Sequence, residues 1–420
     1  MRLRLALPAG LLDTGAASLA TFIVQAYAVR TLDLETLGVY AVFFSAYLFA
    51  SQATQFLFLY PLEIAVLKLP RSTRFELLRR SIRLATPAPI LGGLGVLAAI
   101  LLSGSSATSL RLGFAITVGA AAITSPVYEH FKRMLHLSDR SWQAAGVAQS
   151  QLLALVVVVA VMVVSGVPPA WVPFGALAAS HGVALGAGFA TIRFGEMPPL
   201  RTSFMDLLRS GRWLLVSGLM PPLATLIAAG VITRLAGATE LGLAQAAHVA
   251  SRPILILATG LSAVLGYRLM ESGSTRRRSD GNRYWRLYAA LILLGGGAYM
   301  LVVGVDWPGN PMAALLPRAY EVGGLVLVTL AANFVSALLR PVRNELIGAH
   351  WEARVALVDT SAAAALIAVA AFAGYLGAFA VPLGVLAGAL VHAAGYLPAR
   401  ITMYATSAPR LEGATPAGEG

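Results

Sequence analysis

The sequence predicts an all-α membrane protein with about twelve transmembrane helices, arranged as two six-helix lobes around a central cavity. The first reason is composition, since 58% of the 420 residues are hydrophobic and 12% are charged, whereas a soluble domain carries roughly 25% charged residues. The second is that apolar runs long enough to cross a bilayer recur from end to end. The third is that basic residues gather in alternate connections between these runs.

A helix needs about 20 mainly apolar residues to cross the hydrocarbon core. Twelve such runs are predicted, and no gap between them is long enough for a separate soluble domain. Because Asp13 interrupts the first run, it is interpreted as a retained helix rather than a signal peptide. The runs cover residues 8–30, 36–61, 84–103, 111–130, 142–164, 171–191, 213–234, 241–267, 287–305, 319–339, 355–375 and 378–399.

The distribution of basic residues predicts the orientation. One side of the membrane receives both termini and the connections at 62–83, 131–141, 192–212, 268–286 and 340–354. This side holds 26 of the 31 Lys and Arg residues. The other side holds four, which are Arg30, Arg111, Arg234 and Arg318. Since Lys and Arg concentrate in short cytoplasmic connections, both termini are expected in the cytoplasm.

The connections on the basic side are the longer ones. Residues 67–83 and 128–142 are amphipathic and are predicted to form interfacial helices. Residues 274–286 are strongly basic, and the preferred interpretation is an ordinary positive-inside signal. The alternative is a segment that lies on anionic membrane lipids. Residues 406–420 are small and polar, so a disordered cytoplasmic tail is predicted there.

Several chemistries have no basis in this sequence. There is no cysteine, which excludes disulfides and thiolate metal sites. No GxxxxGK[ST] phosphate loop indicates a fused ATPase, and no His or acidic cluster suggests a metal site or a metal-dependent glycosyltransferase. The net charge of +12 is explained by its position in membrane connections rather than by nucleic-acid binding. The chain is therefore expected to be a monomeric non-enzyme without a cofactor.

An internal repeat supports the two lobes. When "VRTLDLETLGVY" (29–40) is aligned with "TRLAGATELGLA" (233–244), Arg30 falls on Arg234 and Gly38 on Gly242, with an offset of 204 residues. Each pattern ends one predicted span and opens the next. Six spans followed by six spans predict a parallel repeat, with an N-terminal lobe at 1–200 and a C-terminal lobe at 201–405.

The segment from Ser18 to Val66 resembles the opening of the polysaccharide (Wzx-type) flippases, in the pattern formed by Arg30, Glu35, Gly38 and Tyr40. This family belongs to the multidrug/oligosaccharidyl-lipid/polysaccharide (MOP) exporter superfamily. The resemblance implies a MATE-like fold of two six-helix lobes in the bacterial plasma membrane. It also implies flipping of undecaprenyl-pyrophosphate-linked oligosaccharides without ATP hydrolysis, beside the polysaccharide polymerase and export machinery.

Arg252 is the one basic residue within a predicted span. A charge at mid-bilayer costs about 2.5–3.5 kcal/mol on insertion scales, so it faces protein or water. It lies about 16 Å into its span, on one helical face with Gln245, His248 and Thr259. This stripe is predicted to line the cavity, where a guanidinium suits pyrophosphate. The alternative is a structural Arg252 that binds carbonyls freed by Pro253 or a carboxylate on another helix.

Amides of the first two spans complete the predicted substrate-binding set. Gln25 shares a polar face with Thr14, Ser18 and Thr21, and Gln52 and Gln55 share one with Ser45. These faces are predicted to line the cavity. The alternative is that their hydrogen bonds only hold helices together.

Three carboxylates, Asp13, Glu63 and Asp359, lie in or near spans. Each is a candidate for coupling transport to a Na+ or H+ gradient, and each could instead pair with Arg252. Glu63 is expected to be solvated near the cytoplasmic interface. Asp359 is only about five residues into its predicted helix and could be wet.

Two other functions remain open. A multidrug exporter of the same superfamily would bind cations and would favour carboxylates in its cavity. A membrane-embedded polymerase or ligase would need catalytic residues on a sizeable external loop. The external loops offer little beyond Arg111, Asp306, Arg318 and Glu321. The positive charge within a span favours the flippase.

Overall fold

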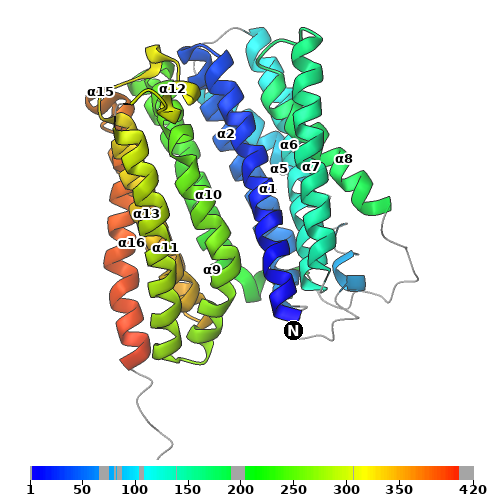
Figure 1. Ribbon diagram of the computed structural model, residues 1–420, viewed down its shortest axis with the longest axis vertical. Coiled ribbons are helices and arrows are strands. Elements are labelled where there is room, and N and C mark those ends of the chain that lie inside the picture. The colour runs from blue at the N-terminus through cyan, green and yellow to red at the C-terminus, as the bar shows by residue number, and fades with distance from the viewer. Residues whose placement is uncertain are drawn as a thin grey trace, which may run out of the picture.

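The computed structural model describes residues 2–65, 75–79, 82, 88–103, 108–138, 140–190, 204–305 and 307–405. Within these ranges the chain is a bundle of long helices without a β-strand (Figure 1). The predicted tail at 406–420 and most of the predicted interfacial segment at 67–83 lie outside the described residues.

The long helices form two groups that pack mainly within themselves. The first group comprises α1 (Arg2–Thr31), α2 (Leu34–Thr54), α5 (Ala88–Leu102), α6 (Thr108–Leu137), α7 (Ser141–Val164) and α8 (Val172–Ala190). The second comprises α9 (Phe204–Leu235), α10 (Ala238–Ser274), α11 (Arg278–Gly304), α13 (Leu325–Gly348), α14 (Glu352–Ala370) and α16 (Ala380–Ala405). Contacts between the groups run chiefly from α1 and α2 to α9 and α10.

Short elements connect or extend these helices. A π-helical turn η1 (Gln55–Leu59) and α3 (Tyr60–Ala65) continue α2. The others are α12 (Pro311–Leu315), the 3-10 turn η4 (Arg318–Tyr320), α15 (Ala373–Leu376) and the 3-10 turn η5 (Gly377–Phe379).

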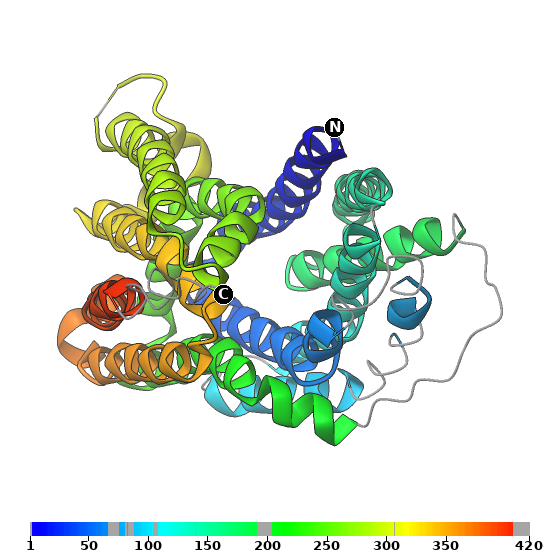
Figure 2. The same cartoon turned by 90° about the horizontal axis from the view of Figure 1, so that it is seen from below.

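Each of the twelve predicted spans overlaps one of the long helices. Eleven helices in the described ranges are long and apolar enough to cross a membrane, and α5 is a shorter apolar helix. The protein is therefore a multi-pass membrane protein. The start of α1 and the end of α16 lie at the same end of the bundle, from which Figure 2 views it (Figures 1 and 2). We call this the terminal end, and the opposite one the far end.

The predicted loops at 131–141, 268–286 and 340–354 are wrong in extent, because helices occupy most of them. Residues 128–142 are not a separate interfacial helix but the end of α6 and the start of α7. The basic segment at 274–286 belongs mostly to α11, and only residues 275–277 separate α10 from α11. The physical reason is that hydropathy detects only the apolar part of a helix, whereas Arg, Glu and Lys continue a helix well beyond the hydrocarbon.

Asp33 begins α2 at the far end. Its carboxylate accepts hydrogen bonds from the Thr36 N–H at 2.9 Å and from the Thr36 hydroxyl at 2.8 Å. Partial burial by itself would raise the pKa of this carboxyl, but these hydrogen bonds outweigh it and hold the pKa below its ordinary value. Asp33 is therefore an N-cap in its ionised form.

Asp33→Ala is expected to lower the free energy of unfolding by about 1 kcal/mol at neutral pH, because the Thr36 amide loses its acceptor. A depressed folded-state pKa stabilises the fold above the ordinary Asp value, and this contribution is lost as pH falls through the lowered value. Thermal unfolding at neutral and at strongly acidic pH measures both effects. Asp33→Asn keeps an acceptor and is the control, so equal losses for Asn and Ala would contradict the cap.

Candidate functional site

A cavity of about 730 Å³ lies between the two groups of helices. Its walls come from α1, α2, α6, α7, α8, α10 and α13. On α1 it extends from Asp13 to Thr21, and on α10 from Arg252 to Met270. Both stretches lie in the part of the helix that leads to the terminal end, so the cavity occupies this half of the bundle. We call it the central cavity.

Arg252 lies at the innermost point of the α10 wall. It is the fifteenth residue of α10, about 21 Å from the far end of that helix at 1.5 Å per residue. Its Nε donates a hydrogen bond to the Gln25 side-chain oxygen at 2.5 Å, and its guanidinium lies 6.0 Å from the Phe44 ring centroid. Within the described ranges no carboxylate forms an ion pair with Arg252. Neither Asp13 nor Asp359 is its partner.

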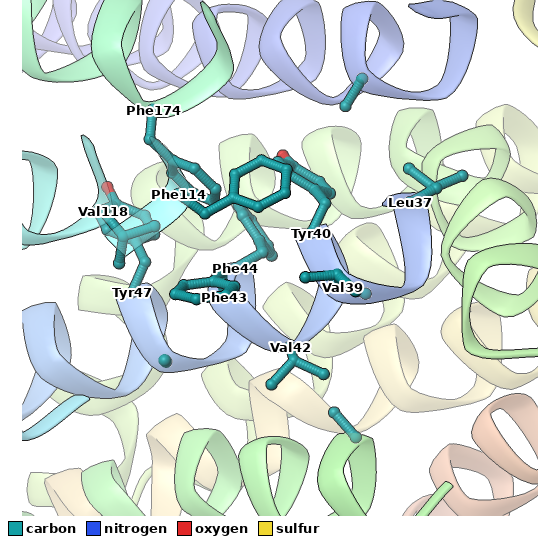
Figure 3. Packing of buried hydrophobic residues seen from close by; sticks show 14 of the residues in the cluster. Leu37, Val39, Tyr40, Val42, Phe43, Phe44, Tyr47, Phe114, Val118 and Phe174 are labelled. Atoms are coloured by element: carbon teal, nitrogen blue, oxygen red, sulfur yellow. The ribbon is translucent and has the colours of Figure 1, made fainter. Parts of the chain in front are cut away.

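The Phe44 ring belongs to an aromatic cluster that fixes this part of α2 (Figure 3). The Tyr40 ring centroid lies 5.1 Å from that of Phe174, and the Phe43 centroid lies 5.5 Å from that of Phe114. Such offset and tilted pairs are favourable for buried rings. Because the cluster immobilises α2, Phe44 presents a fixed face to Arg252.

Asp13 lines the terminal half of the central cavity and is paired there. Its carboxylate lies 3.0 Å from the Lys132 ammonium and 2.9 Å from His136 Nε2. Lys132 also lies 3.2 Å from a Glu129 oxygen. The positive and negative charges of this wall therefore largely compensate one another.

Three Lys or Arg side chains line the central cavity, and they differ in their partners. Lys132 pairs with Asp13 and Glu129, and Arg133 lies 3.1 Å from Glu63. Arg252 has only the neutral Gln25 and an aromatic ring. The uncompensated charge of the cavity is therefore positive and lies at its inner end.

Glu63 is buried, with 4% of its surface exposed, so the predicted solvation is wrong. Its carboxylate lies 2.7 Å from His130 Nδ1 and 3.1 Å from Arg133. These partners come from α6, because α3 brings Glu63 against the buried side of that helix. Glu63 does not line the central cavity.

Asp359 is also buried, which corrects its predicted wet position. It lies 3.3 Å from Arg343 and 3.1 Å from His392, and it accepts hydrogen bonds from the Ser217 and Tyr396 hydroxyls. These partners place α9, α13, α14 and α16 around one carboxylate. Asp359 therefore ties the second helix group together, away from the central cavity.

The predicted polar stripe of α10 is divided between two spaces. Arg252 and Thr259 line the central cavity, whereas Gln245 and His248 line a second pocket of about 220 Å³ among α2, α9, α10, α14 and α16. Phe44 also lines the second pocket. All four residues lie on one face of α10. The Arg252 guanidinium and the Phe44 ring, which lie beside each other, are placed where the central cavity and the second pocket adjoin.

The remaining predicted amides lie outside the central cavity. Gln25 is fully buried and contacts Arg252. Gln55 is buried in the η1 turn, and Gln52 is half-buried, and both are absent from the walls of the two pockets. Only the amide of Gln25 is thus brought to the inner end of the cavity.

The residues that carry the family resemblance meet at the far end. Arg30 and Arg234 are exposed at the ends of α1 and α9. Tyr40 is fully buried in the aromatic cluster. Gly38 and Gly242 lie one turn after the starts of α2 and α10, where these helices touch.

The sequence reasoning missed the basic residues of α6. Lys132, Arg133 and His136 were predicted in an interfacial helix of the connection, yet they lie on α6, and all three line the central cavity. A signal was present, because Tyr128, Glu129, Lys132 and His136 have the spacing of one helical face. Arg340 was also missed, and it donates to the Thr259 hydroxyl at 3.1 Å.

No family model and no curated protein matches the chain. Solved structures do match it over nearly its whole length. One is a multidrug resistance MATE family transporter of the MOP superfamily in an inward-facing conformation, with a TM-score of 0.72, 14% identity and coverage of 95% of this chain and 100% of that one. The chain has the MATE transporter fold.

Two further structures support this fold. A MATE in complex with MaL6 matches with a TM-score of 0.66 and 15% identity, with 96% of each chain covered. An outward-facing MATE family transporter of the MOP superfamily matches with a TM-score of 0.61 and 14% identity, again covering 96% of each chain. At these identities the likeness concerns the fold alone. The MATE fold of this chain places Arg252 between its two helix groups.

Proposed function

We propose that this protein is a membrane transporter that flips an undecaprenyl-pyrophosphate-linked oligosaccharide across the bacterial plasma membrane, as Wzx-type flippases do. The observation that carries the proposal is the unneutralised Arg252 at the inner end of the central cavity. A guanidinium forms charge-assisted, bidentate bonds with phosphate oxygens. The walls beside it carry hydroxyl and amide groups that suit a sugar.

The proposed transport is alternating access without ATP hydrolysis, in a monomer whose termini are cytoplasmic. The central cavity would then receive the lipid-linked glycan from the cytoplasmic leaflet. Asp13, Glu63 and Asp359 remain the candidates for coupling to Na+ or H+, and all three contact a basic side chain. Protonation of the carboxylate, or binding of a cation to it, would break its contact with the basic side chain. Such a change would couple ion movement to a rearrangement of the helices. The proposed neighbours in the membrane are lipids and the polysaccharide polymerase and export machinery.

The second candidate is a multidrug exporter, and its support is that the matching structures include multidrug resistance MATE family transporters. Asp13 and Glu129 are the carboxylates that line the central cavity, and both contact Lys132. A cationic drug would have to displace Lys132 before it could bind either one. An anionic cargo needs no such displacement at Arg252, and therefore the flippase is preferred.

Reconstituted proteoliposomes distinguish these functions. A fluorescent undecaprenyl-pyrophosphate-linked saccharide placed in one leaflet should reach the other leaflet faster than in protein-free vesicles. Efflux of a lipophilic cationic dye, measured in the same preparation, should not change. Dye transport without movement of the saccharide would establish the multidrug exporter instead.

A further inference from the structure

At the far end, α2 and α10 cross so closely that two glycines face backbone atoms. A Cβ on Gly38 would lie 1.8 Å from the Ala238 carbonyl oxygen, and one on Gly242 would lie 2.1 Å from the Leu34 carbonyl oxygen. Real Cβ atoms essentially never come within 3.0 Å of another heavy atom. Because both obstacles are backbone, the helices themselves must separate before a methyl group fits.

The two contacts are reciprocal. Gly38 and Gly242 are 204 residues apart, and so are Leu34 and Ala238. Each helix therefore offers a carbonyl of its first turn to the glycine one turn later on its partner. Equivalent residues of the repeat meet about a local two-fold axis, as in an isologous contact.

A second contact closes the same end. The segment with α12 and η4 packs against the end of α1, where Leu316 is buried. The Tyr320 hydroxyl then donates a hydrogen bond to the Leu32 carbonyl oxygen at 2.5 Å. Burial and the nearby Asp33 carboxylate raise the pKa of Tyr320, so the hydroxyl remains a donor. This bond joins the second helix group to the α1–α2 turn.

These two contacts bear directly on the central cavity. α2 carries Tyr47 and α10 carries Arg252 in the cavity wall. If α2 and α10 separate at the far end, the space behind Arg252 opens toward the far side of the membrane. In this structure, where they touch, the wall of the central cavity on α10 runs from Arg252 toward the terminal end.

We propose that the Gly38–Gly242 crossing and the Tyr320–Leu32 bond form a far-end gate that must separate for the cavity to open on that side. The closed state is possible because positions 38 and 242 carry no side chain that would clash with the partner helix. A larger residue destabilises the closed state and leaves the open state unaffected, so it shifts the population toward opening. The gate would operate for any cargo, and thus it goes beyond the proposed function.

Cysteine accessibility tests the gate directly, because the chain has no cysteine of its own. Ala41→Cys is the reporter, since Ala41 lies three residues after Gly38 on α2 and is 4% exposed. A membrane-impermeant maleimide is added on the far side of sealed vesicles, with sidedness fixed by a protease-accessible C-terminal tag. Gly38→Ala and Gly242→Ala should each label roughly tenfold faster or more than the reporter alone.

Gly260→Ala is the matched control, because it lies on α10 and an added Cβ there would meet only one Leu11 atom at 4.0 Å. It should label at the reporter's rate. If folded Gly38→Ala and Gly242→Ala also label at that rate, the gate is refuted. Should neither fold, Tyr320→Phe decides, since it removes one hydroxyl: faster labelling supports the gate and unchanged labelling overturns it. Labelling requires no cargo, so the result is independent of the proposed flippase function.

Discussion

Arg252→Ala is expected to abolish transport of the lipid-linked glycan while the protein still inserts and folds. Hydrogen bonds to charged groups contribute about 1.5–3 kcal/mol each, and a bidentate pyrophosphate contact would lose two of them. The central cavity would also lose its one uncompensated positive charge. The measurement is the rate of saccharide movement in proteoliposomes, normalised to folded protein. A loss of at least about a hundredfold is expected.

Arg252→Lys should restore transport only in part, because an ammonium keeps the charge but lacks the planar fork. Arg268→Ala is the matched control. It lies on the same helix, pairs with the exposed Glu271 at 3.0 Å and does not line the central cavity. If Arg252→Ala transports at the rate of Arg268→Ala, Arg252 does not bind the anionic headgroup.

Gln25 separates the effect of charge from that of shape at this site. Arg252 Nε donates a hydrogen bond to the Gln25 side-chain oxygen. This bond orients the guanidinium without neutralising its charge. Gln25→Glu has almost the same shape but would form an ion pair with Arg252, and a cargo anion would then have to compete with it. Transport should therefore fall much further in Gln25→Glu than in Gln25→Ala. The opposite order would show that the amide itself is what the cargo needs.

Asp359→Ala is expected to produce the largest loss of stability. Removing one partner of a fully buried ion pair costs about 3–5 kcal/mol, because the other charge is left without compensation. The loss here should lie at or below the lower end of that range, because 32% of the Arg343 side chain is exposed to solvent. Arg343 would be that charge, and the Ser217 and Tyr396 hydroxyls would also lose their acceptor. The unfolding temperature in detergent, followed by the fluorescence of the six tryptophans, should fall by many degrees.

The double variant Asp359→Leu with Arg343→Met is the informative comparison. Replacing both members of a buried ion pair by apolar residues is often neutral or stabilising, so part of the stability should return, although the Ser217 and Tyr396 hydroxyls still lack their acceptor. Asp280→Ala, in the first turn of α11, controls for loss of an aspartate near a helix start and should change stability little. A single Asp359→Ala variant as stable as the parent would show that this carboxylate does not hold the second helix group together.

Much of the fold could be predicted from local patterns. Apolar length predicted the twelve long helices of the described ranges, eleven of which are long and apolar enough to cross a membrane, because a bilayer imposes a minimum length on a crossing. The offset of 204 residues was visible because Gly38 and Gly242 have no tolerated alternative where two backbones touch. Arg252 was found for a similar reason, since an isolated charge in an apolar run is costly and stands out.

The partners of these residues could not be predicted. Asp13 and Lys132 are 119 residues apart, and Arg252 and Gln25 are 227 residues apart. Which charges meet depends on how each helix is rotated about its axis, and a periodic pattern leaves that rotation open by tens of degrees. The same uncertainty explains why Gln245 and His248, expected at the central cavity, line the second pocket, and why Lys132, Arg133 and His136 were expected in an interfacial helix rather than in the cavity wall.

By itself, the sequence determined that this chain crosses a membrane about twelve times, carries a repeat and contains one basic residue within an apolar span. These properties depend on residues within one helix, where the spacing along the sequence determines which side chains share a face. The tertiary structure alone decided that Arg252 lines the central cavity without a carboxylate partner among the described residues, that Asp359 pairs with Arg343, and that Gly38 touches α10. Those contacts form between helices that are far apart in the sequence. They depend on the tertiary structure because the energies of van der Waals contact and ion pairing change strongly over a few ångströms.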